Sequence, residues 1–454
     1  MHRRACWSTW ASGLQVGLGA RTSGEAMRSR TTVMAGRPFI IGGLPGTVSK
    51  ARPYPGSSPG VLLVIPSWGQ RCGVAEYTRF LVDEIRSQGF VAEVARGQDG
   101  EILSLVRRGG FHVAHVQFEY QLYDPAHLGR LVRRLRTQGI QVMATVHDFL
   151  PGQVAANRLI KDEFADVIVH SARLRDELER IGIDRSRIHI IPMGCPKMAL
   201  VDESAVRASL GVGPGPALGY FGFALPQKGI IELAIAARAL RESVFPHLRV
   251  FVFAAPAFFG SGYVSELAGF LKDAGLAEGL VLRTDYLPVQ EVANMLHAMD
   301  INVLPYREVA YIGTSSAVRV LMAAEKPIIT TDIPYFEDLD GEVYKIPSAD
   351  PGRIAEAVLH LMANPAKREE MVYRIRRYVE ANNWSQIARR HARLYTRLAA
   401  LAVCGGPAGL ASDAAAAACQ EPPYAPWEAG DLPRVPAAPP EVWERVVKRF
   451  GKGG

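Results

Sequence analysis

Two stretches of the sequence combine glycine, hydroxyl and cationic residues in an order that suits a phosphate group. The first consists of Gly313, Thr314, Ser315 and Ser316 and precedes an apolar run that predicts a helix. Free amides and hydroxyls at a helix start can bind an anion, although the same residues also serve as ordinary caps. In the second stretch, Lys228 precedes Gly229 and another predicted helix. Its ammonium could reach a diphosphate there, unless it is simply a solvated loop lysine.

Further candidate groups follow three of the expected strands. Gly73 lies in the turn after the first strand, where a glycine lets the backbone approach a ligand. Glu119 follows a second strand, and His147 with Asp148 end a third. Because the strand ends of a parallel sheet face the binding crevice, these residues are candidates for substrate contact. Alternatively, Gly73 is an ordinary turn glycine, and His147 is a buried histidine whose hydrogen bonds are made within the protein.

A repeated α/β pattern positions these residues. Short apolar runs alternate with segments of helical period from residue 61 to 192, and the alternation starts again after the Gly- and Pro-rich turn at 211–216. The expected strands are 61–66, 90–95, 112–118, 140–147, 166–170 and 188–192, then 217–223, 248–255, 279–284, 300–305 and 326–331. The expected helices are 73–88, 125–138, 153–163 and 172–181, then 229–242, 261–274, 289–298, 314–325 and 352–363. The pattern predicts an α/β protein with two facing, doubly wound, Rossmann-like domains and a cleft between them.

Changes in composition set the domain boundaries. We expect a disordered basic leader at 1–59, a first Rossmann-like domain at 60–200, a second at 201–381, an amphipathic helix at 382–401 and a flexible Ala- and Pro-rich tail at 402–454.

Charge and apolar patterning exclude several classes of function. The net charge of +7 comes from the leader, since residues 1–60 hold eight Lys or Arg and one acidic residue and the remainder is neutral. A nucleic-acid partner is therefore not expected. No run of about 18 apolar residues occurs, so no membrane span is expected. Five scattered cysteines without a CxxC pair favour neither a disulfide framework nor a structural zinc, which predicts a cytoplasmic protein.

Residues 60–400 resemble the family 4 glycosyltransferases of group 1 type, which have the two-domain GT-B fold. The resemblance rests on blocks in the family's order: "RCGVAEYTRFLVDEI", "HVQFEYQLYDP", "QVMATVHDF", "RIHIIPMGC", "GFALPQKGIIEL", "GTSSAVRVLMAAEKPIITTDIPYFEDL" and "NNWSQIARRHARLY". In this fold the first domain lies on the acceptor side, the second holds the nucleotide-sugar donor, and the last helix crosses back onto the first domain.

The resemblance implies transfer of a sugar from a UDP-sugar or GDP-sugar donor, with retention of configuration and no obligatory metal or other cofactor. Lys228 would neutralise the leaving diphosphate, helped by the amides of residues 313–316 and by the Gly73 loop. His147 would lie near the transferred sugar and Glu119 nearer the acceptor. Glu76 and Asp148 are further candidates on the acceptor side.

The sequence departs from the family pattern in the donor block. The family usually carries two glutamates eight positions apart, one for the donor sugar and one for the ribose hydroxyls. Alignment puts Ile312 at the sugar position and Val320 at the ribose position. Arg307 and Glu308, just upstream, could supply charge from a neighbouring loop.

Two further positions differ from the family. Phe223 stands where an arginine often precedes the loop lysine, and Glu325 stands where the family prefers glycine. The chain is therefore expected to be either an active transferase with a divergent pocket or a catalytically inactive protein that binds a sugar nucleotide or a glycan. A sugar-nucleotide epimerase is a weaker alternative.

The acceptor class follows only broadly from the resemblance. It implies polysaccharide biosynthesis, with a glycan, a lipid-linked molecule or a small molecule as acceptor. A lipid-linked acceptor would be reached from the surface, with peripheral contact at the inner membrane face through basic segments such as 128–136. Alternatively, that segment is simply the solvent-exposed face of a helix and makes no membrane contact.

Overall fold

The computed structural model describes residues 59–257, 262–309 and 312–403, which belong to one compact unit. Almost all of the expected leader and of the expected tail lies outside these described residues.

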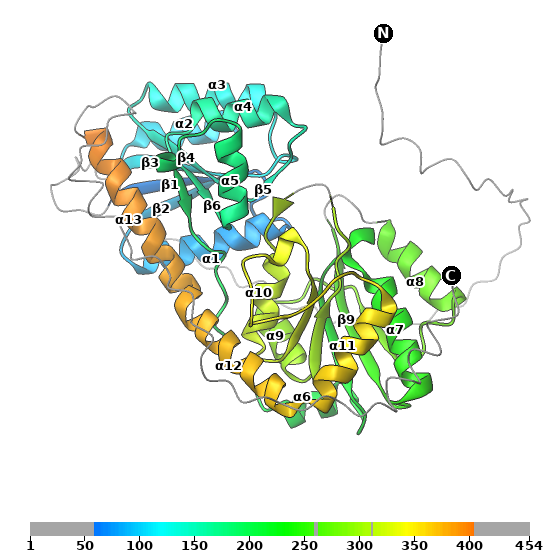
Figure 1. Cartoon of the computed structure of the whole chain (residues 1–454). Coiled ribbons are helices and arrows are strands. Elements are labelled where there is room, and N and C mark those ends of the chain that lie inside the picture. Colours follow the sequence, from blue (N-terminus) through cyan, green and yellow to red (C-terminus); the bar gives the residue numbers. More distant parts are fainter. Residues whose placement is uncertain (1–58, 258–261, 310–311, 404–454) are drawn as a thin grey trace, which may run out of the picture. The chain divides into compact units, whose positions relative to one another are not determined.

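The first half of the chain forms a parallel six-stranded sheet (Figure 1). Its strand order is β2-β1-β3-β4-β6-β7, with bounds Val91–Ala95, Gly60–Val64, Phe111–Phe118, Gln141–Val146, Val167–Val169 and Ile188–Ile190. Its helices are α1 (Gly73–Ser87), α2 (Asp99–Arg108), α3 (Pro125–Arg136), α4 (Val154–Glu163) and α5 (Ala172–Arg180). Side chains alternate across β1, so Val61 and Leu63 join one buried cluster and Leu62 and Val64 join another.

The second half forms another parallel six-stranded sheet. Its strand order is β10-β9-β8-β11-β13-β14, with bounds Leu280–Arg283, Arg249–Pro256, Ala217–Ala224, Ile301–Leu304, Ile328–Thr331 and Tyr344–Ile346. Its helices are α6 (Glu203–Ser209), α7 (Ile230–Ser243), α8 (Tyr263–Asp273), α9 (Val289–His297), α10 (Ser316–Ala323), α11 (Pro351–Ala363) and α12 (Pro365–Asn382). This order reverses direction between β8 and β11, which is the point where a Rossmann-type sheet binds its ligand.

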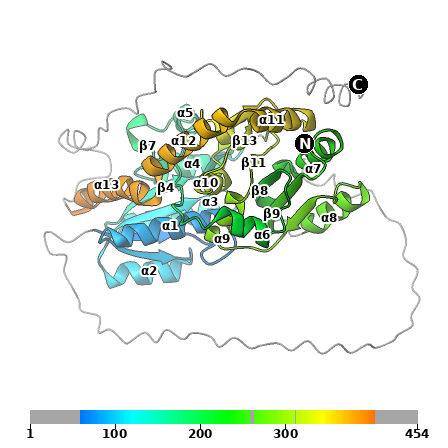
Figure 2. The same cartoon turned by 90° about the horizontal axis from the view of Figure 1, so that it is seen from below.

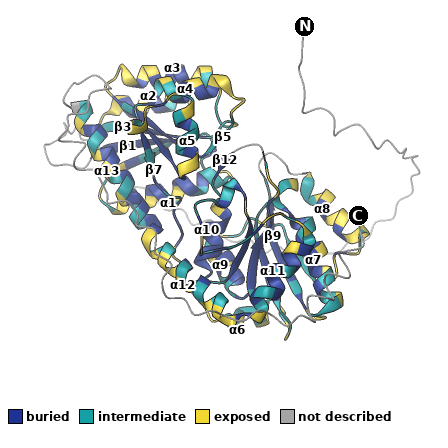
Figure 3. Ribbon diagram, viewed as in Figure 1, coloured by how far each residue is buried: buried dark blue, intermediate teal, exposed yellow. Residues whose placement is uncertain are grey.

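The last helix, α13 (Trp384–Val403), packs on the first sheet although it follows the second in the chain. It contacts α1, β3 and β4 (Figure 2). Trp384, Ile387 and Tyr395 share a buried cluster with Val61 and Leu63. Figure 3 shows the strands of both sheets as largely buried. The doubly wound architecture predicted from the sequence is therefore present twice.

Several elements were not expected from the sequence. Helices α2, α6 and α12 and strand β14 are additional, and a short antiparallel pair joins β5 (Asp148–Phe149) to β12 (Ile312–Gly313). Helix α12 buries only Met371, Ile375 and Asn382, so it lacks the stripe of apolar residues by which an amphipathic helix is predicted from sequence. The β5–β12 pair contains two residues from each strand, which is too short for any sequence pattern to reveal.

Glu325, just after α10, adopts a left-handed backbone conformation with φ of 54°, the one positive φ of a non-glycine residue in the described part of the chain. A residue that follows a helix C-cap commonly adopts this conformation, and glycine does so without steric cost. This geometry accounts for the preference for glycine at this position in the family that the sequence resembles. The Glu325 carboxylate accepts a hydrogen bond from Arg376 Nε at 2.7 Å.

Candidate functional site

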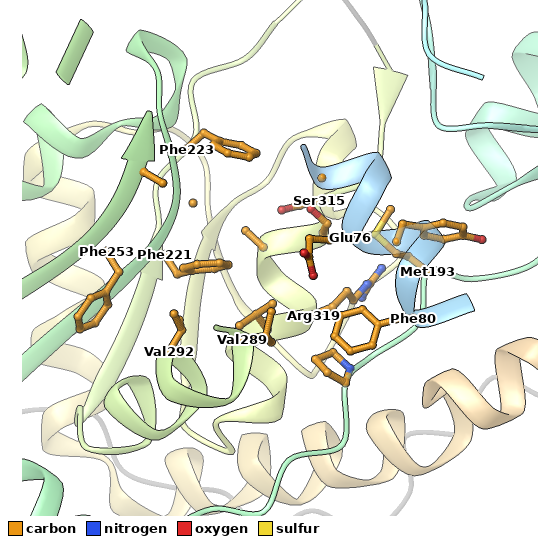
Figure 4. A pocket seen from close by; sticks show the side chains of 18 of the residues that line it. Glu76, Phe80, Met193, Phe221, Phe223, Phe253, Val289, Val292, Ser315 and Arg319 are labelled. Carbon is orange, nitrogen blue, oxygen red and sulfur yellow. The ribbon is translucent and has the colours of Figure 1, made fainter. Parts of the chain in front are cut away.

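A cavity of about 250 Å³ lies at the start of α10, beside the strand ends of the second sheet and the first helix (Figure 4). Six of the residues predicted from the sequence line it: Gly73, Glu76, Lys228, Thr314, Ser315 and Ser316. The two stretches that the sequence marked as phosphate-binding thus reach the same space.

The start of α10 offers unpaired amides to this cavity. Ser315 is the N-cap: its Oγ accepts from the amide of Val318 at 3.5 Å, and its own amide donates to Tyr335 O at 3.2 Å. The capping alternative is therefore correct for the Ser315 hydroxyl. The next two amides, of Ser316 and Ala317, have no acceptor among the described residues. A helix start with free amides carries a partial positive charge, which suits an anion.

Gly73 faces this helix start from α1. A Cβ added to Gly73 would lie 3.7 Å from the Ser316 Oγ. The glycine therefore leaves room between the two helix starts, although this spacing alone would also tolerate an alanine.

Lys228 ends a short 3₁₀ turn, Pro226–Lys228, that follows β8. Its ammonium lies 3.7 Å from the ring centroid of Tyr306 and 5.2 Å from that of Tyr335. Burial lowers its pKa to about 7. No carboxylate in the described part of the chain forms an ion pair with Lys228. A cation between two aromatic rings at a cavity wall is ready to accept an anionic ligand.

Gly229 fixes the position of Lys228. It has φ of 70°, and a Cβ there would lie 1.8 Å from Pro305 O. Glycine is therefore required, because any side chain would clash with the backbone after β11.

Arg319 also lines the cavity, and sequence reasoning missed it. Its side chain is 1% exposed, pairs with Asp338 and lies 5.1 Å from the ring centroid of Tyr378. The signal in the sequence was the arginine in the middle of the apolar run "AVRVLMAA". Its Nε has no hydrogen-bond partner among the described residues. Arg319 is thus a buried cation at the cavity beside the partly buried Lys228, although Asp338 already balances its charge.

His147 does not line the cavity but lies one layer behind it. Its Nε2 is 3.1 Å from Gln117 Oε1 and its Nδ1 is 3.3 Å from His170 Nε2. Tyr77, which does line the cavity, contacts the His147 ring edge-on at 4.8 Å between centroids. Burial lowers the pKa of His147 well below its usual value, so the imidazole is neutral at pH 7. Contact with a transferred sugar stays a prediction for this residue.

Glu119 and Asp148 form a pair of carboxyl groups outside the cavity lining. Burial, with a smaller contribution from Glu119, raises the pKa of Asp148 to about 8, and burial also raises that of Glu119. The Asp148 Oδ1 atom has no hydrogen-bond partner in the described structure. The β5–β12 pairing places Asp148 opposite Gly313, where a glycine Cβ would lie 3.2 Å from the Asp148 Cβ. Asp148 thus lies beside the segment that leads into α10.

Arg307 and Glu308 lie elsewhere. They line a second hollow of about 420 Å³, at the ends of β11, β13 and β14. Arg307 Nε donates to Glu232 Oε1 at 2.6 Å. The structure therefore does not bring these two residues into the first cavity, because the chain turns away from it after Tyr306.

Two family models match the chain. Residues 73–196 match the model described as Glycosyltransferase Family 4, and residues 215–364 match Glycosyl transferases group 1. Together they span more than half of the chain. It is a group 1 glycosyltransferase. No curated protein matches it at the level of sequence.

Solved structures confirm that this glycosyltransferase has the GT-B fold. HepE of Anabaena in complex with UDP superposes with a TM-score of 0.61 at 13% identity, over 74% of this chain and 99% of that one. Sucrose-phosphate synthase of Thermosynechococcus elongatus gives 0.61 at 16% identity, over 75% and 99%. A glycosyltransferase of Rickettsia africae gives 0.61 at 12% identity, over 75% and 98%. At these identities the likeness concerns the fold alone.

The structure places Val320 and Ile312, the residues at the two aligned glutamate positions, in different surroundings. Val320 lines the cavity, whereas Ile312 packs in the buried cluster of the first sheet, paired with Phe149. The carboxylates that line the cavity, Glu76 and Asp285, both pair with arginines, Glu76 with Arg79 at 2.9 Å and Asp285 with Arg283 at 3.1 Å. Of the two positions at which the family carries glutamates, the one held by Val320 thus lies in the cavity wall and the one held by Ile312 lies in the core.

Among the described residues, no helix combines the length and the apolar character needed to cross a bilayer. Within the same residues, no group of three or more His, Cys, Asp or Glu side chains is placed to hold a metal ion.

Proposed function

We propose that this glycosyltransferase moves a sugar from a UDP-sugar or GDP-sugar to a glycan, a lipid-linked molecule or a small molecule, with retention of configuration. The observation that carries the proposal is Lys228, a partly buried lysine without a counter-ion in the described structure, on the same cavity as the free amides of Ser316 and Ala317. A diphosphate would supply the missing negative charge to both.

The chemistry follows from where that charge develops. The bond between the sugar C1 and the diphosphate oxygen breaks, the acceptor oxygen bonds to C1 on the same face, and the acceptor proton passes to the departing diphosphate. Lys228 and the α10 amides would stabilise the growing negative charge on the leaving group. Because these groups already offer positive charge, we propose that no metal or other cofactor is obligatory.

Asp148 and Glu119 suit the acceptor side of this scheme. A carboxyl with a pKa of about 8 is mostly protonated at pH 7, so Asp148 can donate a hydrogen bond to an acceptor oxygen. Its place opposite Gly313, next to the α10 start, supports this assignment.

The first experiment is a thermal-shift and turnover screen of the full chain with UDP, GDP and their sugars, following both Tm and released nucleotide. Lys228→Ala should remove the stabilisation and the release. Lys345→Ala is the matched control, because Lys345 is a half-buried lysine of the same sheet that pairs with Asp332 at 3.6 Å and does not line the cavity. Equal stabilisation of Lys228→Ala and Lys345→Ala would refute the diphosphate site.

A catalytically inactive binding protein is the second candidate. The apolar Val320 in the cavity wall favours it, because the wall then offers fewer hydrogen bonds to a donor. The same screen separates the two: stabilisation without nucleotide release, with candidate acceptors present, favours binding alone, and release favours transfer.

A lipid-linked acceptor would require a surface that reaches a membrane. The basic face of α3 was the candidate, but Arg133 and Arg136 pair with Glu163 and Arg134 pairs with Asp99. Its effective charge is therefore lower than the sequence suggests. Co-sedimentation with anionic phospholipid vesicles at low and high salt tests this contact, and absence of binding at low salt would exclude it.

A further inference from the structure

Val320 lies one helical turn beyond the α10 start. Residues four positions apart on a helix share a face, with Cβ atoms about 5–6 Å apart, and both Ser316 and Val320 line the cavity. In a nucleoside diphosphate, the ribose is attached directly to a phosphate. A phosphate held at Ser316 and Lys228 therefore places the attached ring over Val320.

The cavity wall around Val320 is apolar and aromatic. Val289 and Val292 come from the α9 side, and Phe221 and Phe253 come from β8 and β9 (Figure 4). Flat aromatic side chains suit a planar base, which stacks on them irrespective of its hydrogen-bond pattern. The part of the cavity that lies in this direction from the phosphate is thus the end suited to a nucleoside.

The two carboxylates lining the cavity each bind an arginine through a single oxygen, Glu76 through Oε2 and Asp285 through Oδ2. Glu76 accepts two hydrogen bonds from Arg79, and Asp285 accepts two from Arg283. A ribose 2′-hydroxyl buried against Val320, Val289 and Val292 would lose its water, and these three valine side chains offer it no hydrogen-bond partner. An unpaired buried hydroxyl weakens binding, whereas a hydrogen atom in its place does not.

We propose that the donor site does not recognise the ribose 2′-hydroxyl and takes 2′-deoxynucleoside diphosphates, dTDP in particular, at least as well as ribonucleoside diphosphates. The thymine methyl group would add apolar contact with the aromatic wall. The inference rests on the proposed function, because it assumes that the cavity binds a nucleoside diphosphate.

Isothermal titration of the full chain with UDP, dUDP and dTDP tests the inference. UDP and dUDP differ only in the 2′-hydroxyl, so their Kd values should agree within about threefold, and dTDP should bind as tightly as dUDP or more tightly. A dUDP affinity about tenfold or more below that of UDP would overturn the inference while leaving the proposed function intact. Binding of none of the three would overturn the proposed function itself.

A pair of variants tests the placement of the ribose. Val320→Gln adds a hydrogen-bonding group at the wall and should shift the preference towards UDP over dUDP by about tenfold. Val320→Ala is the control, because it removes volume without adding a polar group and should leave the ratio unchanged. A Val320→Gln protein that keeps its Tm and its ratio would show that the ribose lies elsewhere, and the comparison of the three nucleotides on the unaltered chain does not depend on either variant folding.

Discussion

The ammonium of Lys228 lies 3.7 Å from the centre of the Tyr306 ring, and its positive charge has no carboxylate partner among the described residues. Both residues lie at the point where the strand order of the second sheet reverses, Lys228 after β8 and Tyr306 after β11. Keeping the Lys228 ammonium charged in this setting costs free energy until an anion binds. The titration of Lys228 should therefore report ligand binding.

Donor binding should take up a proton. Because burial lowers the pKa of Lys228 to about 7, most of the free protein carries a neutral amine at pH 8. A bound diphosphate favours the ammonium, so UDP affinity should fall as pH rises above about 7, by up to tenfold per pH unit. Calorimetry at pH 8 in buffers of different ionisation enthalpy measures the uptake. Lys228→Met keeps the length without the charge, and an uptake equal to that of the unaltered protein would exclude the lysine as its source.

Gly229→Ala should destabilise the protein by more than about 2 kcal/mol, because it combines a positive φ with a clash against Pro305 O. Gly275→Ala is the matched control: φ is 66°, but the nearest atom to an added Cβ is Arg238 Nη1 at 4.0 Å. Urea unfolding measures both. Equal losses of unfolding free energy for the two variants would mean that a small shift of the structure relieves the clash with Pro305 O.

Asp338→Asn should cost about 3–5 kcal/mol, because it leaves the buried guanidinium of Arg319 without its partner. The exposed pair between Arg79 and Glu76 provides the comparison, since Arg79→Ala should cost less than about 1 kcal/mol. Chemical denaturation reports both values. A small loss for Asp338→Asn would show that water or a rearranged side chain replaces the carboxylate.

Replacing Glu325 should reveal the backbone strain after α10. Both Glu325→Gly and Glu325→Ala lose the pair with Arg376, but only glycine relieves the positive φ of 54°. The glycine variant should therefore be more stable than the alanine variant by about 1 kcal/mol in thermal unfolding. The reverse order would show that the loss of chain entropy on ordering glycine outweighs the relief of strain.

Acid should destabilise the core of the first sheet. Burial lowers the pKa of His170 and His391 to about 4 and that of His115 well below its usual value. The unfolded chain therefore binds more protons below pH 6.5, and the free energy of unfolding should fall between about pH 6.5 and 4, by up to about 1.4 kcal/mol per pH unit for each histidine. Urea titrations at several pH values measure this slope. His391→Gln should reduce it by about one proton, and an unchanged slope would exclude His391 as a contributor.

The sequence allowed the two doubly wound sheets and part of the site to be predicted for a definite physical reason. Buried parallel strands are continuous apolar runs, and a glycine or lysine that follows such a run reaches the ligand edge of its sheet. This reasoning placed Gly73, Lys228 and Ser316 on one cavity.

Other features depend on contacts between distant segments. The pairing of Asp148 with Gly313 joins residues far apart in the chain through two strands of two residues each, and no local sequence pattern predicts it. Arg319 appears in the sequence only as an interruption of an apolar helix, and nothing near it in the sequence points to its partner Asp338. The turn of the chain after Tyr306, which takes Arg307 to another hollow, is likewise invisible in the sequence.

The course of α13 limits how the protein can be rebuilt. Its side chains complete the core beneath the first sheet, and Trp384, at its first turn, also contributes to the cavity wall. A chimera that exchanges donor halves between glycosyltransferases would therefore need two junctions, one before the second sheet and one after α12. With a single junction, the first sheet would receive a foreign helix against an interface that evolved for this one.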